Sequence, residues 1–295
     1  MNNCNLLPDK LNLNMKGFGN SYCREISLWK WILLFLGGVI LFLLLYSGAQ
    51  TASMTEMNTP LKICISLVAA SLLVMVYYLV VGKIEKRKVD ELITISAGSW
   101  AGKGLLCGIG YFSIITAILA IFGMYSIDGY DFNVTNLIER FVFFLVIAVG
   151  EEIIFRGIIF RMIAERWNVA AALIVSSLLF GVMHIFNPDA SIWSSIAIAI
   201  EAGLLLGAAY SFSGNLWLPI GIHWTWNFME GNIFGFDVSG SPESYRLLTP
   251  SISGPDILTG GGFGPEASII ALVLGGSLSF WFIWKYYKAH GRCTY

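Results

Sequence analysis

Charged side chains are scarce in this chain. Only 13% of its 295 residues are charged and 56% are hydrophobic, whereas about 25% of a typical soluble domain is charged. The mean hydropathy is +0.71. The single core of a water-soluble protein of this size cannot bury so much apolar surface, which excludes an ordinary soluble enzyme. The sequence therefore predicts an integral membrane protein whose main solvent is lipid.

Histidine and cysteine are also few, and their spacing excludes several kinds of site. The three histidines form no His-Glu-x-x-His motif, and the sequence has neither a Gly-x-Ser-x-Gly elbow nor a phosphate-binding glycine loop. The five cysteines are widely scattered, so that neither a cysteine zinc site nor a disulfide framework is indicated. A net charge of −1 gives no indication of a nucleic-acid partner.

Long apolar runs are what the chain has instead. A helix needs roughly 20 apolar residues to cross a bilayer. Such runs occupy 31–48, 61–82, 104–126, 137–160, 169–187, 191–210, 216–234 and 266–287. We therefore expect an all-α, polytopic transmembrane helical bundle of about eight spans. The first run follows a polar arm and lacks a small-residue cleavage site after it, so we expect a retained span rather than a removed signal peptide.

These runs divide the chain into five expected parts. A polar arm, 1–30, precedes three plain apolar helices, 31–126, and a segment, 127–234, that contains four spans. A Gly-, Ser- and Pro-rich loop, 235–265, leads to the last helix and a basic tail, 266–295. The loop is either a partly re-entrant lid or a solvated connection, and its apolar anchors would be Phe234, Phe236, Leu247, Leu248, Ile252 and Phe263.

Basic residues alternate from loop to loop. They gather in the N-terminal arm, between the second and third spans, between the fourth and fifth, and in the tail, whereas the loops 49–60, 127–136 and 235–265 hold only Arg246. Cytoplasmic loops are enriched in Lys and Arg. This pattern predicts that both termini are cytoplasmic and agrees with an even number of spans.

Ionisable and strongly polar groups inside the spans are confined to the second half of the chain. They include Glu151, Glu152, Arg156, His184, Glu201, His223 and Asn227. A charge within a span costs about 2.5–3.5 kcal/mol on insertion scales, so such residues are rare and usually functional. We therefore expect the chemistry in spans four to seven.

The adjacent glutamates have different expected environments. Glu152 and Arg156 are four residues apart and share a helix face, so they can pair. Glu151 is rotated by about 100° and is not neutralised by the same arginine. It can face a polar cavity, where a carboxylate can act as a general base on water. The alternative is that both glutamates only join helices through hydrogen bonds.

Two further helices repeat the four-residue spacing. Phe180 and His184 share one face, and Gly181 between them would permit the close approach of another helix. His223 and Asn227 present two hydrogen-bond donors that could stabilise an oxyanion. Each pair could instead be an ordinary core or interhelical contact. Glu201 has no such companion and is interpreted as a supporting or structural residue.

Together, Glu-Glu-x-x-x-Arg, Phe-x-x-x-His and His-x-x-x-Asn, in this order over residues 137–230, resemble the CPBP family. That family comprises CAAX prenyl endopeptidases and the bacteriocin-processing or self-immunity proteins also called Abi proteins. The resemblance implies an intramembrane protease with 127–234 as its catalytic core. It implies that Glu151 and His184 activate water, that His223 and Asn227 form the oxyanion site, and that Glu152, Arg156 and Phe180 support them.

The resemblance leaves the cofactor open. Family members are described both as metalloproteases and as glutamate-type proteases. The sequence requires no cofactor and favours the glutamate type, because its ligand spacing matches no familiar zinc site. If zinc is bound, Glu151, His184 and His223 would be its ligands.

The expected function is hydrolysis of a peptide bond in a membrane-associated protein or peptide, in the plasma membrane of a bacterium. Two alternatives remain at this point: a non-catalytic bacteriocin-immunity or regulatory protein, and a proton-coupled transporter, since buried carboxylates and histidines also relay protons. The sequence does not identify the substrate, the side from which it arrives, or the oligomeric state.

Overall fold

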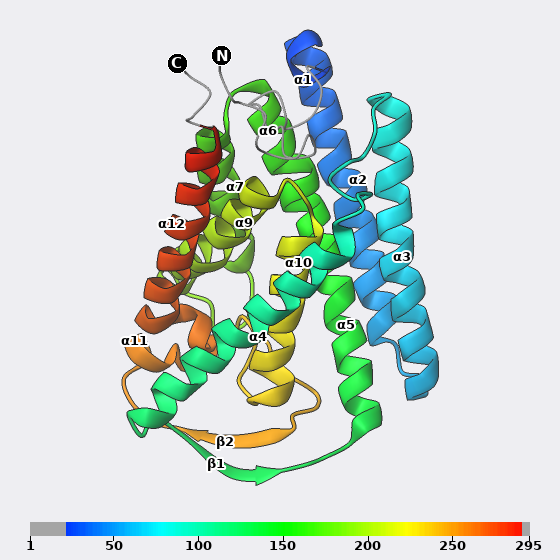
Figure 1. Ribbon diagram of the computed structural model, residues 1–295. Helices are drawn as coiled ribbons and strands as arrows, with labels where there is room; N and C mark the ends of the chain where they lie inside the picture. The colour runs from blue at the N-terminus through cyan, green and yellow to red at the C-terminus, as the bar shows by residue number, and fades with distance from the viewer. Residues whose placement is uncertain (1–21, 291–295) are drawn as a thin grey trace.

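The computed structural model describes residues 22–290, and it is an all-α bundle, as expected. Within these residues, eight long helical segments follow the eight apolar runs (Figure 1). The unbroken helices are α2 (Leu28–Met54), α3 (Thr59–Ile84), α4 (Ala97–Ile121), α7 (Val169–His184) and α12 (Ile269–His290). A short helix, α1 (Tyr22–Glu25), precedes them. The expectations for the arm 1–21 and the tail 291–295 lie outside the described residues.

Three of the eight segments are composite helices with a wider, π-helical stretch inside them. The first runs through α5 (Val134–Glu152), η2 (Ile153–Phe160) and α6 (Arg161–Arg166). The second runs through α8 (Ile192–Ile198), η3 (Ala199–Leu204) and α9 (Leu205–Ser213), and the third through α10 (Trp217–Asn227) and η4 (Phe228–Ile233). Glu152 directly precedes η2, Glu201 lies in η3 and Glu230 lies in η4. π-Helical turns are frequent at functional sites.

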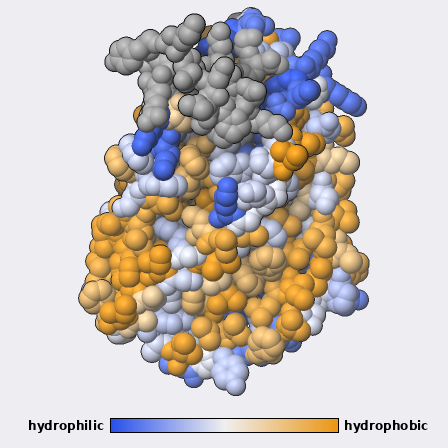
Figure 2. All heavy atoms as spheres, in the orientation of Figure 1, coloured by the Kyte–Doolittle hydropathy of each residue, from blue (hydrophilic) through white to orange (hydrophobic). Residues whose placement is uncertain are grey.

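The molecule is a multi-pass membrane protein. Among the described residues, five helices are long and apolar enough to cross a bilayer: Leu28–Met54, Thr59–Ile84, Ala97–Ile121, Ile192–Ser213 and Ile269–Ala289. Figure 2 shows hydrophobic side chains over most of the visible face, with hydrophilic ones toward the end that holds α1. The expected number of eight spans stays a prediction.

Glycines bring α4 and α10 into direct backbone contact. A Cβ atom on Gly104 would lie 2.4 Å from the carbonyl oxygen of Leu218, and one on Gly108 would lie 2.4 Å from that of Ile222. Only hydrogen fits at either position. This crossing fixes the helix that bears His223 and Asn227 against α4.

One end of the bundle is closed by a small two-stranded sheet that the sequence did not predict. Strand β1 (Tyr125–Tyr130) pairs antiparallel with β2 (Leu248–Ile252), with an irregularity between Ile127 and Gly129 (Figure 1). The expected loop 127–136 therefore contains most of a strand. The expected third span, 104–126, was wrong at both ends, because the helix begins at Ala97 and ends at Ile121.

Segment 235–265 contains regular structure, although its residues 251–257 are exposed. It contains β2, α11 (Asp256–Thr259) and η5 (Gly261–Phe263), and η6 (Pro265–Ala267) follows at its end. Of the expected apolar anchors, Phe236 and Phe263 are buried, three are partly buried, and Ile252 is 44% exposed. The segment packs its aromatic side chains into the bundle and is not a free connection.

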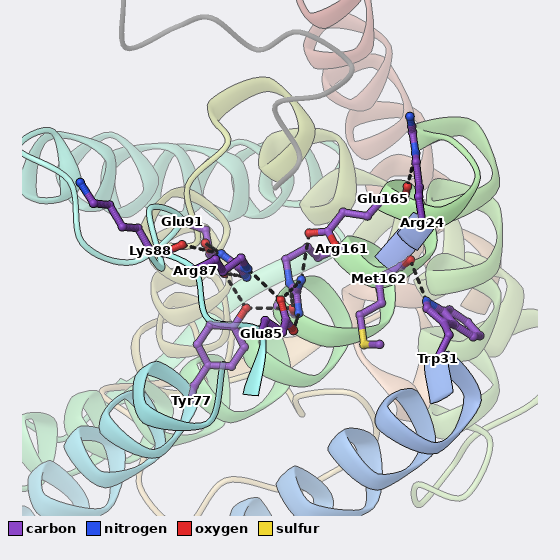
Figure 3. A network of polar contacts seen from close by, with 11 residues as sticks. Arg24, Trp31, Tyr77, Glu85, Arg87, Lys88, Glu91, Arg161, Met162 and Glu165 are labelled. Atoms are coloured by element: carbon purple, nitrogen blue, oxygen red, sulfur yellow. Dashed lines mark hydrogen bonds and ion pairs between the residues drawn. The ribbon is translucent and has the colours of Figure 1, made fainter. Parts of the chain in front are cut away.

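A buried polar network holds the opposite end of the bundle (Figure 3). Arg161 donates hydrogen bonds of 2.6 and 2.9 Å to Glu85 and one of 2.9 Å to Glu165. Arg87 donates bonds of 2.6 and 2.9 Å to Glu91 and one of 2.8 Å to Glu85. These contacts join the segment after α3 to α6. They fix the end of the composite helix that begins as α5.

Candidate active site

A cavity of about 590 Å³ brings the candidate residues together. It is lined by residues from α2, α5, α7 and α10 and by the segment 238–244. Glu151, His184, His223 and Asn227 all contribute to its wall, as does Phe180. The structure therefore places the residues of three separate motifs around one space.

Glu151 and His184 lie at matching depths along their helices. Glu151 is fifteen residues before the end of α6 at Arg166, and His184 is fifteen residues after the start of α7 at Val169. At the 1.5 Å rise of an α-helix, His184 is about 22 Å from the turn that joins the two helices, and Glu151 is no farther, because the wider η2 rises less per residue. The sequence ranges place Glu151 at mid-span and His184 near an outer end. The structure removes this difference, because the composite helix is much longer than α7.

Glu152 holds two basic groups at the same oxygen. Its Oε1 accepts a hydrogen bond of 2.8 Å from Arg156 and one of 2.9 Å from Nδ1 of His223. Glu152 and Arg156 are both 0% exposed. The four-residue pairing expected from the sequence is present, and the histidine on α10 is an additional partner. Glu152 is thus the residue that links the first motif to the third.

Arg156 uses its other end to hold a neighbouring helix. Its Nη2 donates to the carbonyl oxygens of Ala202 and Gly203, at 3.3 and 3.0 Å. Both carbonyls belong to η3. Its guanidinium also lies 4.9 Å from the ring centroid of Phe180. A planar group with several donors suits this arrangement, which a lysine could not reproduce.

Glu151 has one bound oxygen and one that is free of protein donors. Tyr46 on α2 donates a hydrogen bond of 2.9 Å to Oε1. Oε2 has no hydrogen-bond partner and lies 3.9 Å from Nε2 of His223. The hydroxyl of Tyr46 therefore orients the carboxylate, whose second oxygen is buried beside His223 without a hydrogen-bond partner of its own.

Gly150 makes the contact with Tyr46 possible. A Cβ atom at position 150 would lie 2.2 Å from the aromatic ring of Tyr46. The ring thus packs directly against the backbone of α5 at Gly150, the residue before the glutamate pair. Sequence reasoning missed Tyr46, since a tyrosine within an otherwise apolar first span carries no signal of its own.

The side chain of His184 is held by its own helix. Its Nδ1 lies 2.7 Å from the carbonyl oxygen of Phe180. A carbonyl only accepts, so Nδ1 bears the proton and Nε2 of the neutral ring is left as an acceptor. The rings of Phe180 and His184 are 4.6 Å apart. This arrangement gives the imidazole a fixed orientation and one unprotonated nitrogen.

Gly181 has the function expected for it. A Cβ atom there would lie 2.4 Å from the carbonyl oxygen of Ser195 and 2.6 Å from Cβ of Ala199. The glycine therefore lets α7 approach the composite helix of α8 and η3. This packing positions His184, which lies three residues further along α7.

His223 bears a proton on the nitrogen that faces Glu152, because a carboxylate only accepts hydrogen bonds. Its Nε2 faces Glu151. In the neutral ring Nε2 is an acceptor, and in the imidazolium it is a donor. Asn227 is one helical turn further along α10 and is 6% exposed. The two side chains can both donate to the same point only when His223 is doubly protonated.

The ligand set named for zinc does not converge. Among the described residues, no group of three His, Cys, Asp or Glu side chains is close enough to hold one metal ion. Glu151, His184 and His223 surround the cavity but are not arranged as a ligand triad.

A second group of buried carboxylates lies behind the cavity. Glu201 accepts a hydrogen bond of 2.6 Å from Tyr111, and Glu266 accepts one of 2.9 Å from Trp226. Glu230 is 0% exposed. Glu201 is thus a buried partner of Tyr111, and its supporting or structural role stays a prediction. Glu266 also lines the cavity, which the sequence did not indicate because this residue falls at the edge of the last apolar run.

Residues 133–229 match the family model described as type II CAAX prenyl endopeptidase Rce1-like. The matched part contains all three motifs, and the resemblance to the CPBP family is confirmed. It supports a CAAX-type intramembrane endopeptidase in general. No curated protein and no solved structure gives a significant match to the chain.

Proposed function

We propose that the chain is an intramembrane endopeptidase in which Glu151 and His184 activate a water molecule. The observation that carries this proposal is that Glu151 and His184 line the same cavity, and that the buried Oε2 of Glu151 has no hydrogen-bond partner among the described residues. A carboxylate and an imidazole that both accept hydrogen bonds can hold one water between them. The glutamate-type mechanism expected from the sequence needs this arrangement.

The proposed reaction uses these side chains and the bound water as follows. Glu151 takes a proton from the water, and the resulting hydroxide attacks the carbonyl carbon of the scissile peptide bond. The proton passes to the leaving amine nitrogen as the carbon–nitrogen bond breaks, which regenerates the carboxylate. General acid–base catalysis of this kind typically contributes about 10²–10⁴-fold.

His223 and Asn227 are the proposed donors to the oxyanion. The carboxylates of Glu152 and Glu151 beside the ring of His223, at 2.9 and 3.9 Å, stabilise the imidazolium, which can donate from Nε2. Glu152 and Arg156 act as positioning residues, since they hold His223 and η3. Removal of one oxyanion donor typically costs about 10²–10³-fold in rate.

The surroundings of the cavity fit a membrane-associated substrate. α2 lines one side and α7 another, and Leu178, Val182 and Met183 of α7 are about half exposed, at 59%, 57% and 46%. An apolar surface of this kind is in contact with lipid when the protein is in a bilayer. The substrate would be a protein or peptide anchored in the bacterial plasma membrane.

The test compares new N-terminal peptides in membranes from cells that express the wild-type chain, Glu151→Ala or His184→Ala at matched levels. Products that are lost in both variants would support the protease and identify a substrate. If the three sets of peptides match while the wild-type phenotype persists in both variants, the catalytic proposal is wrong and the immunity or regulatory alternative leads. Solute movement driven by a pH gradient would favour the transporter.

A further inference from the structure

The two ends of the bundle differ strongly in charge. Among the described residues, ten Lys and Arg side chains lie near the end that holds α1: Arg24, Lys30, Lys83, Lys86, Arg87, Lys88, Arg161, Arg166, Lys285 and Lys288. Three lie near the end that holds the two-stranded sheet of β1 and β2, which we call the sheet end: Lys62, Arg140 and Arg246. By the positive-inside rule, the sheet end is extracytoplasmic.

The cavity reaches the sheet end. Its wall includes Glu56 in the turn between α2 and α3, Lys62 in the first turns of α3, and Glu139 near the start of α5. Asn187, in the turn after α7, lies at the same end. These residues extend the cavity from Glu151 and His184 toward the sheet end. The polar network of Arg161 and Glu85 instead closes the opposite end.

Segment 235–265 forms part of the mouth of this cavity. Val238, Ser239, Ser241, Pro242, Glu243 and Ser244 line it. Arg140 forms an ion pair with Glu243, which ties the segment to the start of α5. The open side of the site is therefore built from loops of the charge-poor end.

We propose that the site receives its substrate from the extracytoplasmic side. The substrate class is a membrane-anchored polypeptide whose chain leaves the bilayer on that face, with the scissile bond in the part that emerges. This inference rests on the proposed protease function for the cleavage step, but the orientation of the cavity can be measured without any activity. A substrate exposed only in the cytoplasm, such as a prenylated C-terminus, would not reach this mouth.

The first test is labelling of single cysteines by a membrane-impermeant maleimide. The five native cysteines are first replaced by serine. A single cysteine is then introduced by Ser241→Cys in the cavity mouth, Glu56→Cys at the sheet end, or Lys88→Cys at the other end. Glu56 and Lys88 are both exposed. Spheroplasts expose the extracytoplasmic face, and inverted vesicles expose the cytoplasmic face.

We expect positions 56 and 241 to label in spheroplasts at least about tenfold more than in inverted vesicles, and position 88 to show the reverse. Labelling of positions 56 and 241 only in inverted vesicles would overturn the inference, whether or not the chain cleaves anything. Retained labelling after detergent permeabilisation in every variant confirms that each thiol is reactive.

The second test locates the cleaved bonds. Products that depend on Glu151 should carry new N-termini in segments that face the extracytoplasmic side of their own membrane proteins. Products confined to cytoplasmic segments would overturn the inference while leaving the protease intact. If no product depends on Glu151, both the protease and this substrate class are wrong, even when the labelling pattern is as expected.

Discussion

The hydroxyl of Tyr46 donates a hydrogen bond of 2.9 Å to Oε1 of Glu151, across 105 positions of sequence. The first apolar helix is therefore part of the candidate site. Hydrogen bonds to charged groups contribute about 1.5–3 kcal/mol, and this one also fixes which carboxylate oxygen remains free.

Tyr46→Phe should reduce the cleavage rate with little change in the amount of folded protein. The loss of the bond to Glu151 predicts a fall in kcat of about tenfold or more. Tyr78→Phe is the matched control, because Tyr78 is 43% exposed on α3. Equal rates for the two variants would show that Tyr46 does not orient the carboxylate.

Arg156→Met should strongly destabilise the fold. It leaves Glu152 as a buried carboxylate without its arginine, and breaking a buried ion pair typically costs about 3–5 kcal/mol. Thermal unfolding in detergent is the measurement. The double variant Glu152→Met, Arg156→Met should unfold at a higher temperature than Arg156→Met, since it buries no uncompensated charge. A double variant less stable than the single one would contradict this account.

Glu230→Gln should behave in the opposite way to Glu152→Gln. Glu230 is fully buried, and neither of its carboxyl oxygens has a hydrogen-bond partner among the described residues. A neutral amide of the same size breaks no ion pair and buries no charge, so Tm should stay the same or rise. Glu152→Gln weakens the contacts with Arg156 and His223 and should lower Tm. A Glu230→Gln variant that loses as much as Glu152→Gln would show that the buried charge is needed.

Gly181→Ala should lower both Tm and activity. Its new methyl group meets a backbone oxygen at 2.4 Å, which cannot move without shifting a helix, and overpacking typically costs about 1–3 kcal/mol. The shift would displace His184. Gly110→Ala is the matched control, because a Cβ atom there meets nothing within 4 Å. Similar behaviour of the two variants would argue against close packing at α7.

The network at the basic end predicts a pH effect on stability. Burial raises the pKa of the Glu91 carboxyl, but the hydrogen bonds from Arg87 outweigh it, so that the pKa lies below its ordinary value of 4.5. The folded-state pKa is thus depressed. The stabilisation from Glu91 is complete above about pH 4.5 and is lost as pH falls through the folded value.

Glu91→Gln should therefore have a lower Tm than the wild type near neutral pH, and the gap should narrow below about pH 4.5. Thermal unfolding over a pH series measures it. A gap that is constant with pH would indicate that the carboxylate charge does not stabilise this network.

The sequence predicted what depends on spacing along one helix. The pairing of Glu152 with Arg156 and the close packing at Gly181 follow from helical periodicity, and both are present. The apolar runs likewise located the long helices, because lipid imposes a length on each span.

What it missed depends on contacts between helices. The bond from His223 to Glu152 joins α10 to α5, and the bond from Tyr46 to Glu151 joins α2 to α5. Neither contact follows from a local pattern, and Tyr46 lies in an otherwise apolar span without a signal of its own. The π-helical stretches and the pairing of β1 with β2 are likewise set by tertiary packing.

The most direct test of the central claim is the rate at which purified protein in lipid nanodiscs releases a new N-terminus from a substrate identified in membranes. Asp128, exposed on β1, supplies the matched control Asp128→Asn. The account predicts that this control equals the wild type and that Glu151→Gln is slower by at least about 100-fold. A Glu151→Gln variant that cleaves as fast as Asp128→Asn would show that Glu151 is not the group that activates water.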